Sequence, residues 1–362
     1  MSEGQVRIGV IGAGGIAAVH AAAIAEAGNV VAGTCDVHRE RAEVLAAGYP
    51  DAVVFDDVGA LLADDSIPAV VVALPNCLHS SIAVQALEAG KDVLLEKPMA
   101  TSIEECDAIL AAMEDAPGLV QLGFVCRHAA TTLSAMGAIE SGRLGRIYRA
   151  DATMYRRRGI PGLGGWFTTR SMSGGGVLID LGPHLVDLLL HLCGRPRVQS
   201  VDCSITSHFG HPPSGYRFTD MWAGPPVMDG PFDVEDGATA LLRCEGSLDM
   251  TLNMCWASHL PEKVLPDGVT LFGENGAMHF DIWGDTVTMG TELDDASVDI
   301  TRPIKDGENW NTAFRRQHET FSCNVGTRTA PASTAVQGRE VQCVLDALYR
   351  SNEARSSVEV AG

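Results

Sequence analysis

The sequence predicts an α/β protein built from two domains, and three observations support this prediction. Short apolar segments alternate with helical patterns over the first 125 residues, which is typical of a doubly wound parallel sheet. From residue 147 to residue 280, strand-like segments follow one another with few helices between them. This second pattern predicts an α+β region with a mostly antiparallel sheet. The length of 362 residues also suits two domains better than one.

In the first domain, the expected strands are short runs of Val, Ile, Ala or Leu, and most helical segments end at a glycine. The strands cover 6–11, 30–35, 69–74, 92–95 and 119–124, and the helices cover 16–27, 38–47, 80–89 and 102–114. The run 69–74 is apolar throughout, as expected for a strand buried on both faces. Ser102 and Glu105 have the spacing of a capping box at the start of the last helix.

In the second domain, a helix over 131–141 precedes the strand-like segments. These cover 147–154, 198–207, 238–244, 247–256, 269–272 and 277–280, and helical segments at 319–322 and 334–351 close the chain. Asn275-Gly276 is a strong signal for a tight hairpin. Residues 211–231 are rich in Pro and Gly and predict a long loop. We place the domains at 1–126 and 127–362, and the C-terminal helix could pack back on the first domain.

Composition limits the classes of partner. The formal net charge of −20 argues against nucleic acid or an anionic membrane, because neither would be attracted to an acidic surface. No apolar run approaches the roughly 18 residues of a membrane span, and no signal peptide is expected. The ten cysteines show no C-x-x-C pair and are expected to be reduced thiols in a cytoplasmic protein.

A glycine-rich turn follows the first strand. Gly12, Gly14 and Gly15 precede Ile16 and Ala17 in a G-x-G-x-x-A pattern between a strand and a helix. The first glycine permits a tight turn, the second lets the backbone approach a pyrophosphate, and the alanine lets helix and strand pack closely. Because the pattern stands in the right context, it predicts a Rossmann domain that binds a dinucleotide.

The end of the second strand bears on the choice of cofactor. Asp36 stands 24 residues after Gly12, where a carboxylate accepts hydrogen bonds from the adenosine ribose and repels a 2′-phosphate. This favours NAD. His38 and Arg39 follow directly and could instead turn toward a 2′-phosphate, so NADP stays an alternative.

Two longer segments carry a family resemblance. Residues 73–79 read ALPNCLH, residues 90–98 read GKDVLLEKP, and residues 174–187 read GGGVLIDLGPHLVD. Together with the glycine loop, and in this order, they resemble the glucose–fructose oxidoreductase/inositol dehydrogenase (Gfo/Idh/MocA) family over nearly the whole chain.

The resemblance implies a Rossmann domain followed by an α+β domain with a large open sheet, through which members form dimers or tetramers. It implies that Lys97, Asp180 and His184 form the catalytic group and that the Lys97–Pro98 peptide is often cis. The residues expected to line the cofactor cleft are Leu74, Pro75, Asn76, His79, Glu96 and Lys97.

These residue types also suit the chemistry. Oxidation of a secondary alcohol requires loss of the hydroxyl proton as hydride leaves carbon, and a histidine such as His184 can accept that proton near neutral pH. Lys97 can hydrogen-bond the same oxygen and stabilise the developing alkoxide. Asp180 can bind a neighbouring hydroxyl or orient the base, and Pro183 predicts a kink or a helix start between Asp180 and His184.

The substrate is less well defined. Arg127, Tyr155 and Trp166 are candidates for substrate binding, with Trp166 as a platform for sugar C–H groups. The arginines at 156–158 would suit a phosphate on an activated sugar, whereas the acidic balance would suit a cationic amino sugar. We expect a sugar, cyclitol or aminoglycoside-type substrate.

Other functions are alternatives or lack support. A non-catalytic NAD(P)-sensing protein would have no need of Lys97, Asp180 and His184. A lyase or hydrolase with tightly bound NAD would oxidise its substrate transiently and accumulate no NADH. No metal site is expected, because His184, Asp187 and His191 lack further ligands.

Overall fold

The computed structural model describes residues 5–210, 217, 221–261 and 267–361. The chain divides into two compact units. Unit 1 comprises Met1–Phe124 and Asn311–Gln342, and unit 2 comprises Val125–Trp310 and Cys343–Gly362. Residues 311–342 thus group with the N-terminal residues, although they come near the end of the sequence.

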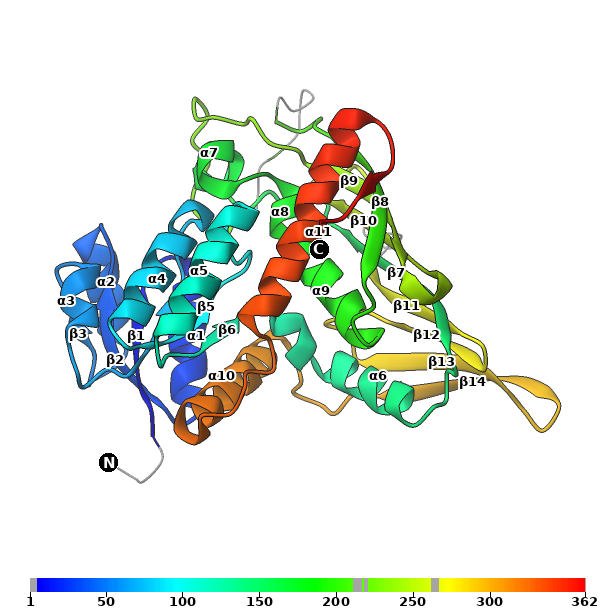
Figure 1. Ribbon diagram of the computed structural model, residues 1–362, viewed down its shortest axis with the longest axis horizontal. Helices are drawn as coiled ribbons and strands as arrows, with labels where there is room; N and C mark the ends of the chain where they lie inside the picture. Colours follow the sequence, from blue (N-terminus) through cyan, green and yellow to red (C-terminus); the bar gives the residue numbers. More distant parts are fainter. Residues whose placement is uncertain (1–4, 211–216, 218–220, 262–266, 362) are drawn as a thin grey trace. The chain divides into compact units, whose positions relative to one another are not determined.

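Unit 1 contains a six-stranded sheet in the order β3-β2-β1-β4-β5-β6 (Figure 1), and every pair in it is parallel. This is the strand order of a Rossmann fold. The strands are β1 Arg7–Ile11, β2 Val30–Cys35, β3 Val53–Val54, β4 Ala69–Val72, β5 Asp92–Leu95 and β6 Val120–Leu122. The helices are α1 Gly15–Glu26, α2 Arg39–Ala46, α3 Val58–Leu62, α4 His79–Glu88 and α5 Ile103–Asp115, with a 3₁₀ turn η1 at Asn76–Leu78.

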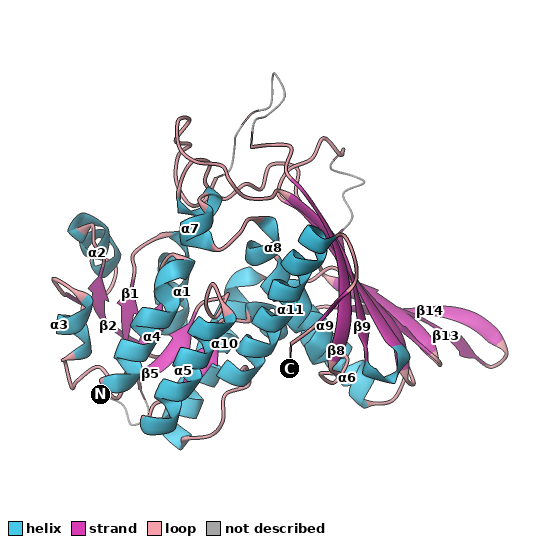
Figure 2. Cartoon of the chain, turned by 45° about the horizontal axis from the view of Figure 1, so that its top comes forward, coloured by secondary structure: helices cyan, strands magenta, loops and turns pink. Residues whose placement is uncertain are grey.

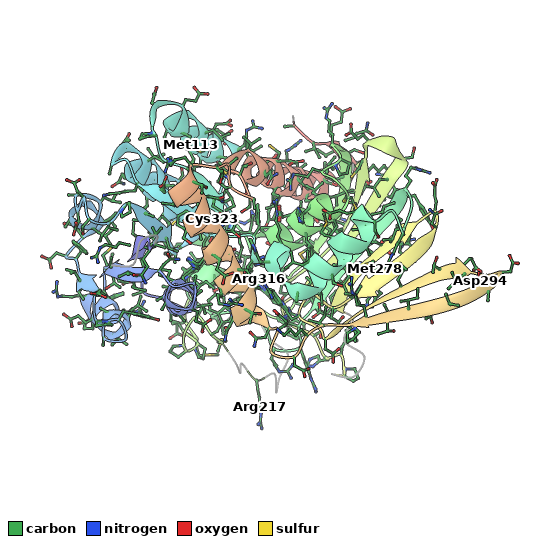
Figure 3. The ribbon with its side chains drawn as sticks, turned by 90° about the horizontal axis from the view of Figure 1, so that it is seen from below. Met113, Arg217, Met278, Asp294, Arg316 and Cys323 are labelled. Atoms are coloured by element: carbon green, nitrogen blue, oxygen red, sulfur yellow. The ribbon has the colours of Figure 1, made fainter. Side chains whose placement is uncertain are left out.

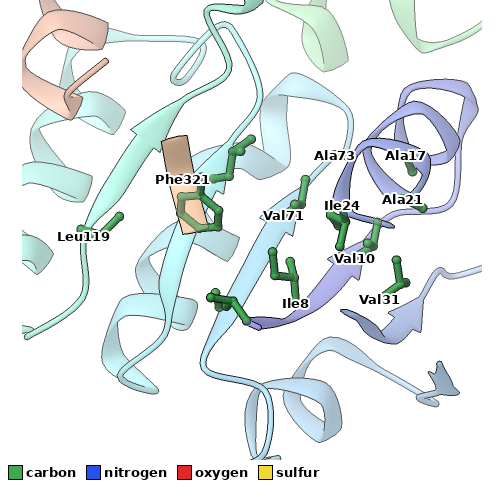
Figure 4. Close-up of a cluster of buried hydrophobic side chains, with 13 residues drawn as sticks. Ile8, Val10, Ala17, Ala21, Ile24, Val31, Val71, Ala73, Leu119 and Phe321 are labelled. Atoms are coloured by element: carbon green, nitrogen blue, oxygen red, sulfur yellow. The ribbon is translucent and has the colours of Figure 1, made fainter. Parts of the chain in front are cut away.

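Every residue of β4 and β5 is buried, and for β4 this is the predicted burial on both faces. The core cluster of unit 1 joins the sheet to two helices: Ala17 and Ile24 of α1, Val10 of β1, Val71 of β4 and Phe321 of helix α10 (Trp310–Thr327) (Figure 4). Ala17 is fully buried, so the small side chain does allow close packing of the first helix on the sheet. Phe321, which comes from the far end of the sequence, completes that core.

Unit 2 contains a nine-stranded sheet in the order β14-β13-β12-β11-β7-β10-β9-β8-β15. Only β7 and β10 pair in parallel; the other pairs are antiparallel. The strands are β7 Ile147–Tyr155, β8 Val198–Thr206, β9 Gly237–Cys244, β10 Leu248–Cys255, β11 Asp267–Gly273, β12 Gly276–Phe280, β13 Thr286–Leu293, β14 Ala296–Pro303 and β15 Val358–Glu359. The predicted turn at Asn275 joins β11 to β12.

Helices cover one face of this sheet (Figure 2). The helices of unit 2 include α6 Ala130–Glu140, α7 Arg170–Ser173, α8 Val177–Asp180 and α9 Gly182–Leu192, of which α6, α8 and α9 contact strands of the sheet. The 3₁₀ turns are η2 Val125–His128, η3 Trp166–Thr168 and η4 Glu245–Ser247. Helix α11 (Ala335–Ala354) belongs to unit 1 up to Gln342 and to unit 2 from Cys343. Helix α9 packs against β7 and β10, whose alternate residues, such as Ala152 and Leu252, are fully buried.

Among the described residues, the sequence prediction missed strands β3, β13, β14 and β15, helix α3 and most of helix α10. Strands β13 and β14 form a hairpin around Asp294 and Asp295, both with positive φ; Asp294 lies near its tip (Figure 3). Strand β14 is almost wholly exposed, so it has little apolar alternation to signal a strand. Helix α10 extends far beyond the predicted 319–322.

Part of the predicted loop 211–231 lies outside the described residues. All ten cysteines are free thiols. Among the described helices, no single one is long and apolar enough to cross a membrane, although the bent pair 170–180 and 182–192 reaches that length and composition.

Candidate active site

The glycine loop has the geometry that a dinucleotide requires. Gly12 has a φ of +94°, and a Cβ atom there would lie 2.3 Å from the carbonyl oxygen of Ala73, so only glycine fits. Gly14 and Gly15 are exposed, and a Cβ on Gly14 would have no heavy atom within 4 Å. Helix α1 begins at Gly15, and with Ile16 in its first turn it presents unpaired N–H groups to a phosphate. The loop therefore fits a pyrophosphate.

Asp36 joins the end of β2 to this loop. Its carboxylate accepts hydrogen bonds from the backbone N–H of Ala13 (2.8 Å) and of His38 (2.8 Å), and it is only partly exposed. Arg39 pairs instead with Glu43 (2.9 Å) and with Asp56. The carboxylate is thus fixed where an adenosine ribose is expected, while the nearby guanidinium is already paired with two carboxylates.

The loop that carries Glu96, Lys97 and Pro98, here called the lysine loop, follows β5. The Lys97–Pro98 peptide is cis. Glu96 is 6% exposed, and its Oε2 atom accepts a hydrogen bond from the backbone N–H of Lys97 (3.1 Å). Its Oε1 atom lies 2.8 Å from Nε2 of His20. The Glu96 carboxylate, predicted to line the cofactor cleft, therefore hydrogen-bonds inside unit 1 and holds the backbone of the lysine.

His79 connects the lysine loop to the loop after β4. Its Nδ1 atom lies 2.7 Å from the carbonyl oxygen of Pro98, and its Nε2 atom lies 2.9 Å from that of Leu74. The ring is 1% exposed, and burial lowers the pKa of His79 below its ordinary value. Between these loops, Pro75 is half-buried and Asn76 is buried in the first position of η1.

In unit 2, glycines and a buried carboxylate set the start of α8. A Cβ on Gly176 would lie 1.9 Å from the carbonyl oxygen of Glu235. The Glu235 side chain, 3% exposed, accepts hydrogen bonds from the N–H of Gly176 (2.8 Å), the N–H of Leu178 (3.0 Å) and the hydroxyl of Tyr349 (2.8 Å). Burial raises the pKa of Glu235. This arrangement fixes α8, which ends at Asp180.

Helices α8 and α9 hold two of the predicted catalytic residues. The segments on either side of Leu181 are bent by 44°, and Pro183 stands in the first turn of α9, as predicted for a helix start. Asp180 Oδ2 accepts a hydrogen bond from the indole Nε1–H of Trp256 (2.8 Å). His184 is 9% exposed, and its Nδ1 atom lies 3.7 Å from Sγ of Cys126. Both residues are therefore held by buried neighbours.

The structure gives Arg127 a role inside unit 2. Its guanidinium, 4% exposed, donates to both carboxylate oxygens of Asp187, at 2.8 and 2.5 Å. Arg195 also donates to Asp187 (3.3 Å). Burial and the positive charge of Arg127 lower the pKa of the neighbouring His191 to about 4. Two of the donors of Arg127 are therefore already used, which argues against the predicted substrate contact.

Tyr155, the last residue of β7, is on the face of the strand opposite to helix α9. Along β7, the residues that face helix α9 are Ala150, Ala152 and Met154, and side chains alternate between the two faces of a strand. Tyr155 therefore points to the other face of the sheet, beside its partner Cys255 in β10.

Trp166 and two of the arginines at 156–158 have defined contacts inside unit 2. The half-buried indole of Trp166 stacks on Phe167, with 3.7 Å between ring centroids. Arg156 pairs with Asp267 (2.8 Å), and Arg158 donates to backbone carbonyl oxygens. Trp166 as a platform for a sugar stays a prediction, whereas Arg156 and Arg158 are already engaged, which leaves them less available to bind a phosphate.

Sequence reasoning missed four partners: His20, Trp256, Glu235 and Tyr349. The sequence does contain one signal for Trp256, since a buried tryptophan at the end of a strand needs an acceptor for its N–H. The others come from segments far from the motifs, and nothing in their spacing indicates them.

Lys97 and Glu96 thus belong to unit 1, and Asp180 and His184 belong to unit 2. A Rossmann domain with a phosphate-binding loop, joined to a domain with a histidine and carboxylates, defines a nucleotide-dependent oxidoreductase. Residues 6–124 match the oxidoreductase family with an NAD-binding Rossmann fold, and residues 132–279 match the GFO/IDH/MocA C-terminal domain. The chain belongs to this GFO/IDH/MocA family, and its cofactor is NAD.

Similar proteins agree with this assignment. D-glucoside 3-dehydrogenase of Escherichia coli (strain K12) is 29% identical, over 99% of this chain and 99% of the relative. Inositol 2-dehydrogenase 2 of Saccharopolyspora erythraea is 33% identical, over 52% of this chain and 54% of the relative. A solved levoglucosan dehydrogenase, in complex with NADH and levoglucosan, has a TM-score of 0.87 at 21% identity, over 99% of this chain and 100% of that chain. At that identity the likeness is one of fold.

Proposed function

We propose that this protein is an NAD-dependent dehydrogenase that oxidises a secondary hydroxyl of a sugar or cyclitol, or reduces the corresponding ketone. The observation that carries the proposal is the likeness to D-glucoside 3-dehydrogenase over nearly the full length of both chains. The half-buried Asp180, held by the buried Trp256, and the His184 ring in unit 2 supply the polar groups that such a substrate needs.

In this proposal, bound NAD accepts or supplies the hydride, and the protein handles the proton. Because Nδ1 of His184 faces Cys126, we assign proton transfer to Nε2. Lys97 donates a hydrogen bond to the reacting oxygen and stabilises its negative charge as the proton leaves. Asp180, oriented by the indole N–H of Trp256, accepts a hydrogen bond from a neighbouring substrate hydroxyl.

The substrate is expected to be uncharged at the oxidised ring. Arg156 and Arg158 are engaged by Asp267 and by backbone carbonyls, so the arginine run offers little to a phosphate. The stacked Trp166 suits the C–H face of a pyranose or cyclitol ring. An aminoglycoside-type substrate is a second candidate within the same proposal, because its amino groups would suit the net negative charge of the protein.

A screen of glucosides, free sugars, inositols and aminoglycosides for NAD⁺ reduction tests the proposal. Stoichiometric accumulation of NADH is expected with at least one substrate, and it excludes a lyase or hydrolase that uses NAD transiently. Lys97→Ala and His184→Ala should each lower kcat by at least about 100-fold while NADH binding, followed by its fluorescence, is retained. Full turnover by either variant would remove the role given to that residue.

A further inference from the structure

Three buried polar side chains, those of Glu96, His20 and His318, form a hydrogen-bonded row inside unit 1, next to the lysine loop. Glu96 Oε1 lies 2.8 Å from Nε2 of His20, and His20 Nδ1 lies 2.9 Å from Nε2 of His318. Both histidines are fully buried, and Glu96 is 6% exposed. This row of side chains connects three elements: α1, the end of β5 and α10. Burying three such groups is costly unless each is hydrogen-bonded, so their alignment calls for an explanation.

We infer that His20 is a positioning residue for Lys97, and that it acts through the carboxylate of Glu96. The Oε1 atom of that carboxylate is held by His20, and its Oε2 atom accepts the backbone N–H of Lys97 (3.1 Å). The ring of His20 thus fixes the carboxylate, and the carboxylate fixes the start of the lysine side chain. This inference rests on the role proposed above for Lys97.

The position of His20 adds a link to cofactor binding. His20 lies on α1, five residues after Gly15, where the helix that faces the dinucleotide phosphates begins. At a rise of 1.5 Å per residue, this is about 7.5 Å along the helix axis. Helix α1 therefore both presents its N-terminus to the pyrophosphate and, one and a half turns later, holds the lysine loop.

The hydrogen-bond partners determine the tautomers. A carboxylate oxygen only accepts, so His20 must carry a proton on Nε2. When His20 is neutral, its Nδ1 accepts, and His318 must therefore donate from Nε2. Each hydrogen bond in the row is then donated in the direction of Glu96: His318 donates to His20, and His20 donates to Glu96. His20 also makes edge contacts with the rings of Phe314 and His318, at centroid distances of 5.2 and 5.1 Å, which restrict its rotation.

Two matched variants separate positioning from simple packing. In His20→Gln, the amide nitrogen can take the place of Nε2 and still donate to Glu96. In His20→Asn, the shorter amide takes the place of Nδ1, so it keeps the contact to His318 but does not reach Glu96. Hydrogen bonds to charged groups are worth enough to change rates by about ten-fold or more.

We therefore expect kcat of His20→Asn to fall by about ten-fold or more, whereas His20→Gln stays within about three-fold of the wild type. The affinity for NADH, measured by its fluorescence, should change by less than about three-fold in both, since neither change touches the glycine loop. If both variants lose activity equally, in proportion to their melting temperatures, His20 is a packing residue and the inference is wrong. Wild-type activity in His20→Asn overturns it as well.

Histidine ¹⁵N NMR gives a readout that does not depend on turnover. In the wild-type protein at neutral pH, His20 and His318 should both carry the proton on Nε2, with signals assigned by their loss in His20→Gln and His318→Asn. A His20 ring without a proton on Nε2 excludes the inferred hydrogen bond. If Lys97→Ala keeps full turnover, the role proposed for Lys97 is wrong, while the tautomer result still decides whether His20 holds Glu96.

Discussion

At the residue scale, Asp36 is tied into the nucleotide loop before any cofactor arrives. The N–H groups of Ala13 and His38 hold its two carboxylate oxygens, and each oxygen can accept a further hydrogen bond. A ribose with both hydroxyls can use that capacity, whereas a 2′-phosphate would meet a fixed negative charge. Because Arg39 pairs with Glu43 and Asp56, it offers less compensation for that repulsion.

This predicts that Asp36→Ser shifts the preference from NAD toward NADP. Loss of charged hydrogen bonds to the ribose should lower kcat/KM for NAD by about 10- to 100-fold, and loss of repulsion should raise that for NADP. Asp56→Asn serves as the control, because it changes the partners of Arg39 but leaves Asp36 in place. An unchanged ratio of the two kcat/KM values in Asp36→Ser would show that Asp36 does not select the cofactor.

The pair of Asp180 and Trp256 leads to a second prediction. Trp256→Phe keeps a large aromatic ring but removes the N–H that donates to Asp180 at 2.8 Å. A lost hydrogen bond to a carboxylate should lower kcat/KM for the sugar by about ten-fold or more. Phe280→Leu, at another buried aromatic of unit 2, controls for lost packing. Steady-state kinetics that show equal effects in both variants would contradict the orienting role.

At the same scale, the motifs carry much of what could be predicted. Gly12, Lys97 and His184 could be found from sequence because the glycine loop and the resemblance mark each position. Their partners could not, since His20 meets His318 across nearly the length of the chain and no local pattern records that pairing. The same holds for Arg127, whose partner Asp187 lies 60 residues further along the chain.

At the element scale, the start of α8 depends on a close approach of two backbones. A methyl group on Gly176 would lie 1.9 Å from the carbonyl oxygen of Glu235, so the helix and the segment before β9 would have to separate. Gly176→Ala should therefore lower the free energy of unfolding by at least about 2 kcal/mol and reduce kcat by displacing Asp180.

Gly137→Ala, in α6, is the matched control. A Cβ atom there would have no heavy atom within 4 Å, and alanine favours a helix over glycine by up to about 1 kcal/mol. Denaturant unfolding of both variants tests the pair. The close-packing explanation is wrong if Gly176→Ala is as stable as Gly137→Ala.

The elements themselves were predictable where burial imposes a pattern. Strands such as β2 and β5 coincide with the predicted segments, because apolar residues occupy both faces of each strand. Strand β14 is exposed along most of its length, so its pairing with β13 depends on backbone hydrogen bonds rather than on apolar side chains. Helix α10 has polar residues over most of its surface, and Phe321 acquires its partners only in the folded unit.

At the scale of the whole molecule, the sheet of unit 2 has a second face that its own helices do not cover (Figure 2). Residues of this face on β7 and β10 include Asp151 and Thr251, which hydrogen-bond each other at 2.6 Å. Since the sequence resembles a family whose members associate through this sheet, we predict a homodimer or homotetramer formed by this face. Light scattering should show the oligomer for the wild type and smaller species for Thr239→Arg, at an exposed position of β9. A wild-type monomer would exclude the prediction.

The stability of the molecule should also depend on pH through His191. Burial and the charge of Arg127 lower its pKa in the folded protein to about 4, whereas an unfolded histidine titrates near 6.5. Between these two values the unfolded chain binds a proton that the folded chain does not, so the free energy of unfolding falls as the pH falls from about 6.5 to about 4. Because His191 is only partly buried and water screens its charge, the loss amounts to about 2 kcal/mol or less, and below the folded pKa this residue adds no further loss.

His191→Gln removes the titrating group, so its unfolding free energy should fall less steeply than that of the wild type over the same pH range. His38→Gln, at an exposed position, should leave the slope unchanged. Urea unfolding at a series of pH values measures both. Arg127 and Asp187 are themselves buried and paired. The glutamine retains a polar neighbour for them but does not titrate, so the variant lacks the loss of stability that protonation of His191 causes. A slope equal to that of the wild type would show that His191 titrates normally in the folded protein.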